Sequence, residues 1–185
     1  MTTTVTPVLS LEAFLAQPET KPASEFWDGQ ITQKPMPQGE HSLLQGKLCQ
    51  AINRVAEPER IALAFPELRC VFGGRAIVPD IAIFRWERIP RLPSGRIANR
   101  FELPPDWAIE ILSPEQKYPQ VLGKLLACAE HGTEWGWLID PEEESIWTVS
   151  GDRQVTAWTK GDRPPVLTGL DFAIAVDEIF GWLCL

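Results

Sequence analysis

The sequence contains a series of short apolar runs, rich in β-branched and aromatic residues, that are separated by Pro, Gly or Asp. Runs of this length and composition are typical of β-strands. They are residues 61–65, 68–72, 76–84, 106–112, 135–139, 145–149 and 154–159, with a short strand and a last turn expected within 172–185. The 17 prolines and 8 tryptophans fit such a fold better than a helical bundle, because proline ends helices and tryptophan favours sheets.

Three segments are expected to be helical instead. Apolar residues recur at helical spacing from residue 40 to about 57, immediately before a proline. A second helical region is expected from Ser113, as its N-cap, to about residue 131, where Gly132 ends it. A short helix is expected at residues 11–15. Helices that alternate with strands in this order predict an α/β fold with a mixed β-sheet core flanked by helices.

The chain is expected to divide into two parts. Residues 1–24 have the composition of an N-terminal helix and a linker, and residues 25–185 have a length within the range of a single domain. Two β-hairpins are expected in addition to the core sheet. One occupies residues 25–31 around an Asp-Gly turn, and the other occupies residues 145–159 around Gly151.

Composition limits the classes of function. The net charge of −8 argues against a nucleic-acid binder with a wholly basic surface, but it leaves room for a local basic patch. Four widely spaced cysteines and two histidines argue against a structural zinc site and favour reduced, buried thiols. Residues 1–6 do not resemble a signal peptide, and no apolar run is long enough to span a membrane. A cytoplasmic protein is therefore expected.

Two acidic residues lie inside apolar, strand-like runs, Asp80 within 76–84 and Glu110 within 106–112. A buried carboxylate needs a partner, and side chains alternate between the faces of a strand. If the two strands are neighbours, both carboxylates can meet on one side of the sheet. Paired carboxylates are typical ligands of Mg²⁺, which also keeps several waters. Alternatively, both acids lie at strand ends and face solvent.

Several motifs occur together with these acids in a fixed order. They are Met36–His41, Val78–Ile83, Pro104–Pro114, Lys124 and Trp137–Pro141. This set resembles the Uma2 family of putative restriction endonucleases over roughly residues 25 to 180, and the run around Glu110 is its most specific part. The resemblance implies a restriction-endonuclease-like fold of the PD-(D/E)xK nuclease superfamily.

The resemblance also implies roles for individual residues. Asp80 and Glu110 would bind the metal, Mg²⁺ or alternatively Mn²⁺, and the Ile111 carbonyl would be a further oxygen ligand. The superfamily usually has a lysine two residues after the second acid, where this chain has Leu112. Lys124, from the following helix, is expected to replace it and to position the attacking water.

The chain departs from the family pattern near this lysine. Gln120 stands where the family usually has an acid, and Cys128 stands where it prefers Tyr. Lys117 is a second candidate for the catalytic amine. Glu40 and His41, at the start of the first long helix, are candidate accessory residues, although Glu40 could equally complement the helix dipole and His41 could be a hydrogen-bonding residue at the helix start.

The segment between the two acid-bearing runs is a long loop that carries a cluster of basic residues. They are Arg85, Arg88, Arg91, Arg96 and Arg100. Because the loop joins the two runs, we expect these arginines to contact phosphates beside the acids, or alternatively to form salt bridges or a solubilising surface.

The leading hypothesis is a Mg²⁺-dependent endonuclease that cleaves DNA and assembles as a homodimer or higher homo-oligomer. A non-catalytic binding or assembly protein on the same fold is the main alternative, and Gln120, Cys128 and the negative charge favour it. A metal-dependent phosphodiesterase that acts on RNA or a nucleotide would use the same residues.

Overall fold

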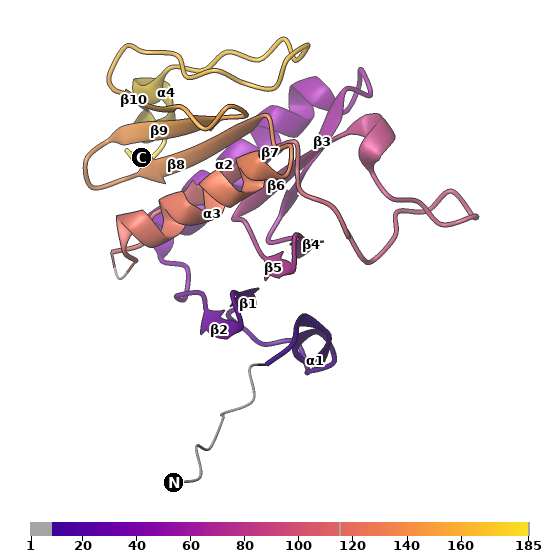
Figure 1. Ribbon diagram of the computed structural model, residues 1–185. Coiled ribbons are helices and arrows are strands. Elements are labelled where there is room, and N and C mark those ends of the chain that lie inside the picture. The colour runs from indigo at the N-terminus through magenta and orange to yellow at the C-terminus, as the bar shows by residue number, and fades with distance from the viewer. Residues whose placement is uncertain (1–8, 115, 185) are drawn as a thin grey trace, which may run out of the picture.

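The centre of the molecule is a six-stranded mixed sheet with the order β10-β9-β8-β7-β6-β3. The computed structural model describes residues 9–114 and 116–184. The strands are β3 (Ala62–Pro66), β6 (Ile81–Arg85), β7 (Trp107–Ile111), β8 (Trp135–Asp140), β9 (Ser145–Ser150) and β10 (Val155–Trp158). Neighbours are antiparallel except for β7 and β8, which are parallel and joined through helix α3 (Tyr118–Glu130). Figure 1 shows this arrangement.

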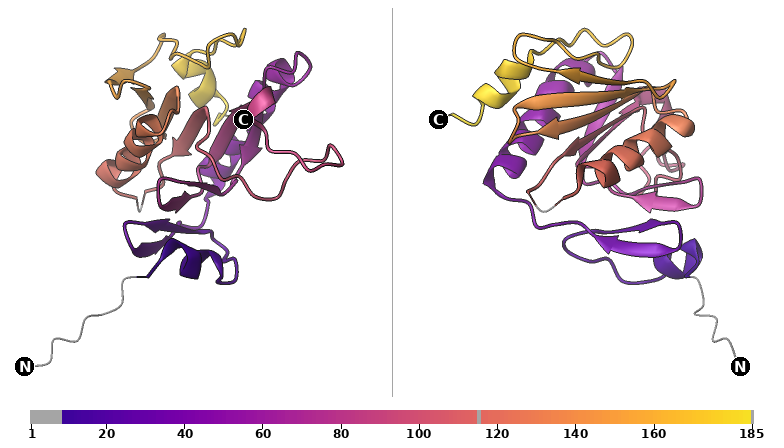
Figure 2. Two further views of the ribbon diagram at one scale, coloured as in Figure 1. Left: turned by 45° about the vertical axis from the view of Figure 1, so that its right-hand side comes forward. Right: turned by 60° about the vertical axis from the view of Figure 1, so that its left-hand side comes forward.

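Helices cover both faces of this sheet, and its central strands β6, β7 and β8 are accordingly buried on both faces. Helix α2 (Gly39–Ala56) packs its buried leucines and isoleucine on one face, together with the last helix, α4 (Val176–Gly181). Helix α3 packs on the opposite face against Ala82, Ala108 and Leu138. Figures 1 and 2 show α2 and α3 on opposite sides of the sheet. The predicted mixed α/β fold is therefore confirmed.

A smaller sheet with the order β2-β1-β5-β4 lies at one end of the large one, as Figure 1 shows. Its strands are β1 (Ser24–Trp27), β2 (Gln30–Gln33), β4 (Cys70–Phe72) and β5 (Arg75–Ile77). The predicted hairpin is β1–β2, whose turn residues Asp28 and Gly29 both have positive φ, as a tight hairpin turn requires. The short helix α1 (Leu11–Leu15) packs on this sheet through stacked Phe14 and Phe26.

Several predicted elements differ from the structure. The apolar run 76–84 is not one strand, because β5 and β6 belong to different sheets and Pro79, which has no N–H to donate, lies between them. Helix α3 begins at Tyr118 and not at Ser113, since Pro119 fits only the first turn of a helix. Glu115, placed in that predicted helix start, lies outside the described residues.

The chain end also differs from the prediction. No strand forms in the described residues 172–184, where α4 is the regular element. The four cysteines are free, as expected, but Cys184 is exposed and Cys49 is only half-buried. Among the described helices, none combines the length and the apolar character needed to cross a membrane. Residues 1–8, on which the signal-peptide expectation depends, lie outside the described part.

Candidate active site

The two acids predicted from sequence lie opposite each other at one end of strands β6 and β7. The antiparallel register pairs Ile81 with Ile109, and its continuation places Asp80 opposite Glu110. The Ile111 N–H donates to Asp80 Oδ2 at 2.7 Å. Both acids are 1% exposed, and the alternation of side chains directs Glu110 to the face covered by α3. Neither acid therefore faces solvent.

Helix α3 brings Lys124 to this pair. Its Nζ lies 2.8 Å from Glu110 Oε1 and 3.1 Å from each carboxylate oxygen of Glu25. The side chain is 9% exposed, so this ammonium is held between two carboxylates in a nearly dry environment. Lys117, the second candidate amine, is exposed at the N-terminal end of α3. Of the two candidate amines, Lys124 is consequently the one that lies beside the acids.

The β1–β2 hairpin contributes two charged residues that the sequence analysis did not single out, Glu25 and Lys34. Glu25, in β1, accepts a hydrogen bond from the Val78 N–H at 2.8 Å in addition to its contacts with Lys124. Lys34 follows β2, and its Nζ lies 2.6 Å from Asp80 Oδ1, 2.7 Å from the Val78 carbonyl and 3.6 Å from Glu110 Oε2. The hairpin therefore completes a cluster of three carboxylates and two lysines.

The accessory candidates take up different positions around the acids. His41, in the first turn of α2, places Nε2 at 3.1 Å from Asp80 Oδ2. Gln45, one turn later, donates to the Asp80 carbonyl at 2.8 Å. Glu40 is exposed and lines a pocket beside His41, and the exposed Gln120 lines a different pocket on the side of Lys124. The start of α2 therefore fixes Asp80 through His41 and Gln45.

Burial and neighbouring charges shift the pKa values of Asp80 and Lys124 in opposite directions. Burial alone would raise the pKa of Asp80, but Lys34, together with the hydrogen bonds from His41 and Ile111, holds that pKa below its ordinary value. Burial lowers the pKa of Lys124, but Glu110 and Glu25 outweigh this effect and raise it above the ordinary value. Asp80 is thus a carboxylate and Lys124 an ammonium at neutral pH.

Two further groups near Lys124 have raised pKa values. Burial raises the pKa of Glu110, and the negative charges of Asp80 and Glu25 add to this, against the opposing effect of the two lysines. Burial raises the pKa of the Cys128 thiol to about 12, with Glu110 contributing in the same direction. Cys128 is therefore neutral and inert at neutral pH.

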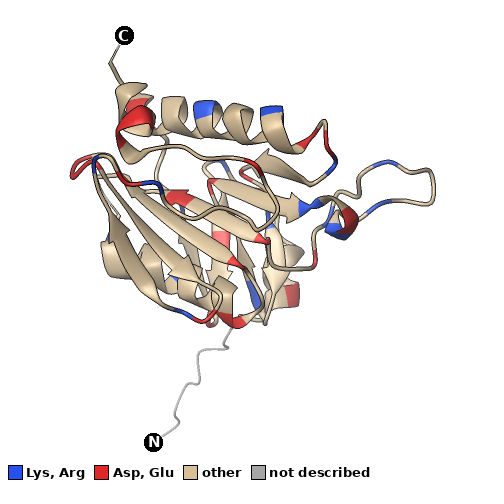
Figure 3. Cartoon of the chain, turned by 90° about the horizontal axis from the view of Figure 1, so that it is seen from above, with Lys and Arg blue, Asp and Glu red and all other residues tan. Residues whose placement is uncertain are grey.

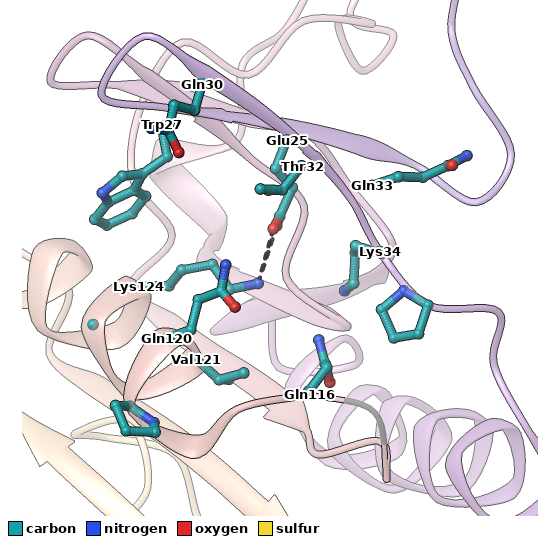
Figure 4. Close-up of a pocket in the computed structure, with 13 residues that line it drawn as sticks. Glu25, Trp27, Gln30, Thr32, Gln33, Lys34, Gln116, Gln120, Val121 and Lys124 are labelled. Atoms are coloured by element: carbon teal, nitrogen blue, oxygen red, sulfur yellow. Dashed lines mark hydrogen bonds and ion pairs between the residues drawn. The ribbon is translucent and has the colours of Figure 1, made fainter.

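Two pockets are lined by residues that contact the acids, Lys34 and Lys124 in one and His41 in the other. The first, about 500 Å³, lies between the β1–β2 hairpin and the start of α3 and contains both lysines. Figure 4 shows Glu25 and Lys124 joined across it, with Lys34 on the hairpin side. The second, about 660 Å³, lies at the start of α2 and is lined by His41 and Ser113. Gln116 lines both pockets, so they are neighbours.

The arginine-rich loop does not lie beside the acids, contrary to the sequence expectation. Strands β6 and β7 are antiparallel, so the loop joins the ends opposite to Asp80 and Glu110, and Arg85 lies about 16 Å along β6 from Asp80. Arg85 pairs with Glu134 at 2.5 Å, and Arg88 pairs with Asp106. The remaining arginines, Arg91, Arg96 and Arg100, are exposed on the loop, whose basic residues Figure 3 shows.

The donor set fits a hard divalent cation that keeps several waters. Across the described residues, no group of three or more His, Cys, Asp or Glu side chains has the arrangement of a metal site. However, Glu110 Oε2 is buried and accepts no hydrogen bond from the described residues, since its nearest ammonium, Lys34, lies 3.6 Å away. Two opposed carboxylates and the Ile111 carbonyl would supply oxygen ligands, as Mg²⁺ prefers, with water completing the shell.

The chain is similar to a protein family and to a solved structure. The model of the Uma2 family, described as "Putative restriction endonuclease", matches residues 11–177. A crystal structure of a putative nuclease belonging to DUF820 from Anabaena variabilis ATCC 29413 superposes with a TM-score of 0.92. The two sequences are 45% identical, and the match covers 94% of this chain and 98% of that one. Comparison with curated proteins gave no significant match. The chain therefore belongs to the Uma2 family.

Proposed function

We propose that this protein is a divalent-metal-dependent endonuclease that hydrolyses phosphodiester bonds in DNA. The Uma2 family is described as putative restriction endonucleases, and the similar crystal structure is of a putative nuclease. The observation that carries the proposal is the convergence of two opposed, buried carboxylates with the ammonium of Lys124, 2.8 Å from Glu110. Acids that bind a metal and a lysine beside them form a constellation suited to phosphoryl chemistry.

Asp80, Glu110 and the Ile111 carbonyl would hold the metal, Mg²⁺ or alternatively Mn²⁺. When bound, such an ion supplies positive charge to a phosphate and lowers the pKa of a water that it holds. Asp80 is suited to this role because its pKa is lowered and it stays ionised. His41 and the Ile111 N–H both bind Asp80 Oδ2 and so fix the orientation of its carboxylate.

Lys124 would position the attacking water and stabilise negative charge on the phosphate. Its raised pKa keeps it protonated, so it donates hydrogen bonds and does not remove the proton from water. Gln120 stands where the family usually has an acid, but Glu25 supplies a carboxylate 3.1 Å from the same ammonium. Glu25 thus replaces the charge partner from a different part of the chain.

The reaction is tested with supercoiled plasmid DNA, with and without millimolar Mg²⁺ or Mn²⁺. Asp80→Asn, Glu110→Gln and Lys124→Met should each lower the cleavage rate by about 100-fold or more, the lower range for removing such groups. Glu130→Gln, on the exposed end of α3, is the matched control and should cleave like the wild type. Cleavage that needs no metal, or that survives Asp80→Asn, would show that the mechanism is wrong.

A non-catalytic binding protein on the same fold is the second candidate. It is favoured by the complete pairing of both acids with lysines and by their 1% exposure. Folded protein that binds neither metal at millimolar concentration would support it. A single-stranded RNA substrate tested in parallel separates a ribonuclease from a deoxyribonuclease.

The remaining proposals concern partners. Cleavage of both DNA strands by a single-site enzyme is simplest for a homodimer or higher homo-oligomer, which light scattering of the active protein tests directly. Arg91, Arg96 and Arg100 would contact phosphates away from the acids, since their loop is exposed. Replacing all three with Ala should weaken DNA binding and flatten its salt dependence without changing metal affinity.

A further inference from the structure

We infer that Lys34 occupies the place of the divalent cation, so that the Lys34 ammonium and a bound metal ion exclude each other. The inference rests on the proposed function, because it takes Asp80 and Glu110 as the ligands of the metal. Lys34 is not among the site residues expected from the sequence, and it gives the β1–β2 hairpin a role at the site.

Lys34 is placed as a bridging cation. Its Nζ contacts Asp80 at 2.6 Å and lies 3.6 Å from Glu110, so a single charge faces both acids. Lys124 has a different position, since it pairs with Glu110 and Glu25. The side chain of Lys34 is 8% exposed, and the Val78 carbonyl accepts a further hydrogen bond from its ammonium.

Charge explains why the two cations would compete. Without Lys34, the opposed carboxylates of Asp80 and Glu110 would be left in a buried site with Lys124 as the nearest ammonium. With a divalent ion between the same oxygens, the Lys34 ammonium would lie a few ångströms from two positive charges with little water to screen them. The site therefore holds one of the two cations at a time.

The first pocket provides space for the displaced Lys34 ammonium. Lys34 lies on the wall of this space of about 500 Å³, with Gln116 and Gln120 opposite on the α3 side. A flexible lysine chain can turn into the pocket and remain solvated there. Lys124 has no such freedom, because Glu25 holds it from the other side.

Calorimetric titration with Mn²⁺, without DNA, tests the exclusion. Lys34→Met removes the competing cation and keeps the volume of the chain, so the dissociation constant should fall by at least about tenfold, the lower range of coupling between close desolvated charges. Lys47→Met, on the exposed face of α2, makes the same change in net charge and should leave the affinity unchanged. Equal affinities of wild type and Lys34→Met would overturn the inference while leaving the metal site in place. Absence of Mn²⁺ binding in all three proteins would overturn the proposed function as well.

A second measurement uses the wild-type chain and does not depend on the folding of a variant. Amine-labelling with mass spectrometry reports the accessibility of each lysine as Mn²⁺ is added. Labelling of Lys34 should rise over the same concentration range as the binding isotherm, while Lys124 stays protected. Metal binding with no change in Lys34 labelling would contradict the exclusion.

Discussion

The hairpin residue Glu25 is predicted to hold both Lys124, the proposed catalytic lysine, and the hairpin itself in place. Its carboxylate binds the Lys124 ammonium through both oxygens at 3.1 Å and the Val78 N–H at 2.8 Å, and its side chain is 8% exposed. Breaking a buried ion pair by removing one partner costs roughly 3–5 kcal/mol, because the other charge stays buried. We take the lower end, about 3 kcal/mol, for Glu25→Ala, since its removal also relieves repulsion with Glu110.

For a chain of this length, about 3 kcal/mol corresponds to a fall in Tm of roughly 6–12 °C. Glu25→Gln keeps an acceptor for the Val78 N–H and should lose about half as much, roughly 1–2 kcal/mol. The measurement is urea unfolding followed by tryptophan fluorescence. Glu130→Ala, which breaks an exposed ion pair with Arg153, is the control and should cost less than about 1 kcal/mol. If Glu25→Ala is no more destabilising than this control, the buried network does not anchor the hairpin.

Two further predictions concern backbone strain and pH. Gly73→Ala should destabilise the fold by about 2–3 kcal/mol in the same unfolding assay, because its φ is +55° and a Cβ would lie 2.2 Å from the His131 ring. Gly74→Ala is the comparison variant: its φ is +74°, but a Cβ there would meet open space, so the substitution should cost about 1 kcal/mol. Equal losses would mean that the ring moves aside freely. The pKa of Asp80 lies below its ordinary value of 3.8, so its contribution to stability is present above that value and is lost as the pH falls further. Thermal unfolding between about pH 5 and pH 2 should therefore be less pH-dependent in Asp80→Asn than in the wild type, and parallel curves would contradict this.

Local sequence patterns were sufficient for the core of the fold and for the pair of acids. Alternation along the two apolar runs, 76–84 and 106–112, predicted that Asp80 and Glu110 would meet on one side of the sheet if the strands were neighbours, and the register of β6 with β7 sets them opposite each other. The start and stop signals at Ser113 and Gly132 likewise predicted a helical region that contains Lys124, and α3 occupies residues 118–130 of it. These features depend on residues close in sequence to the element that carries them.

The contribution of the β1–β2 hairpin, Glu25 and Lys34, could not be predicted from local sequence patterns. Glu25 reaches Lys124 across 99 residues, and Lys34 reaches Asp80 across 46 residues. Both contacts depend on the pairing of β1 with β5, which joins Phe26 to Ala76. A continuous apolar run over 76–84 conceals that pairing, because periodicity does not show that the chain changes sheets at Pro79.

The prediction that the arginine-rich loop lies beside the acids was wrong for a related reason. A loop that joins two strands lies beside a site only if the site is at the ends that it joins. The acids lie at the start of β6 and the end of β7, so the loop is at the other end of both strands. The direction in which the strands run, and not their composition, decides the distance between the arginines and the acids.

The central claim is that Asp80 and Glu110 share a divalent cation. Anomalous diffraction from crystals grown with Mn²⁺ tests this most directly, since it locates the ion independently of activity. We predict a Mn²⁺ peak within coordination distance of carboxylate oxygens of both residues, with the Lys34 ammonium moved into the neighbouring pocket. Crystals at millimolar Mn²⁺ with no peak between these carboxylates, and with Lys34 still bridging them, would contradict it.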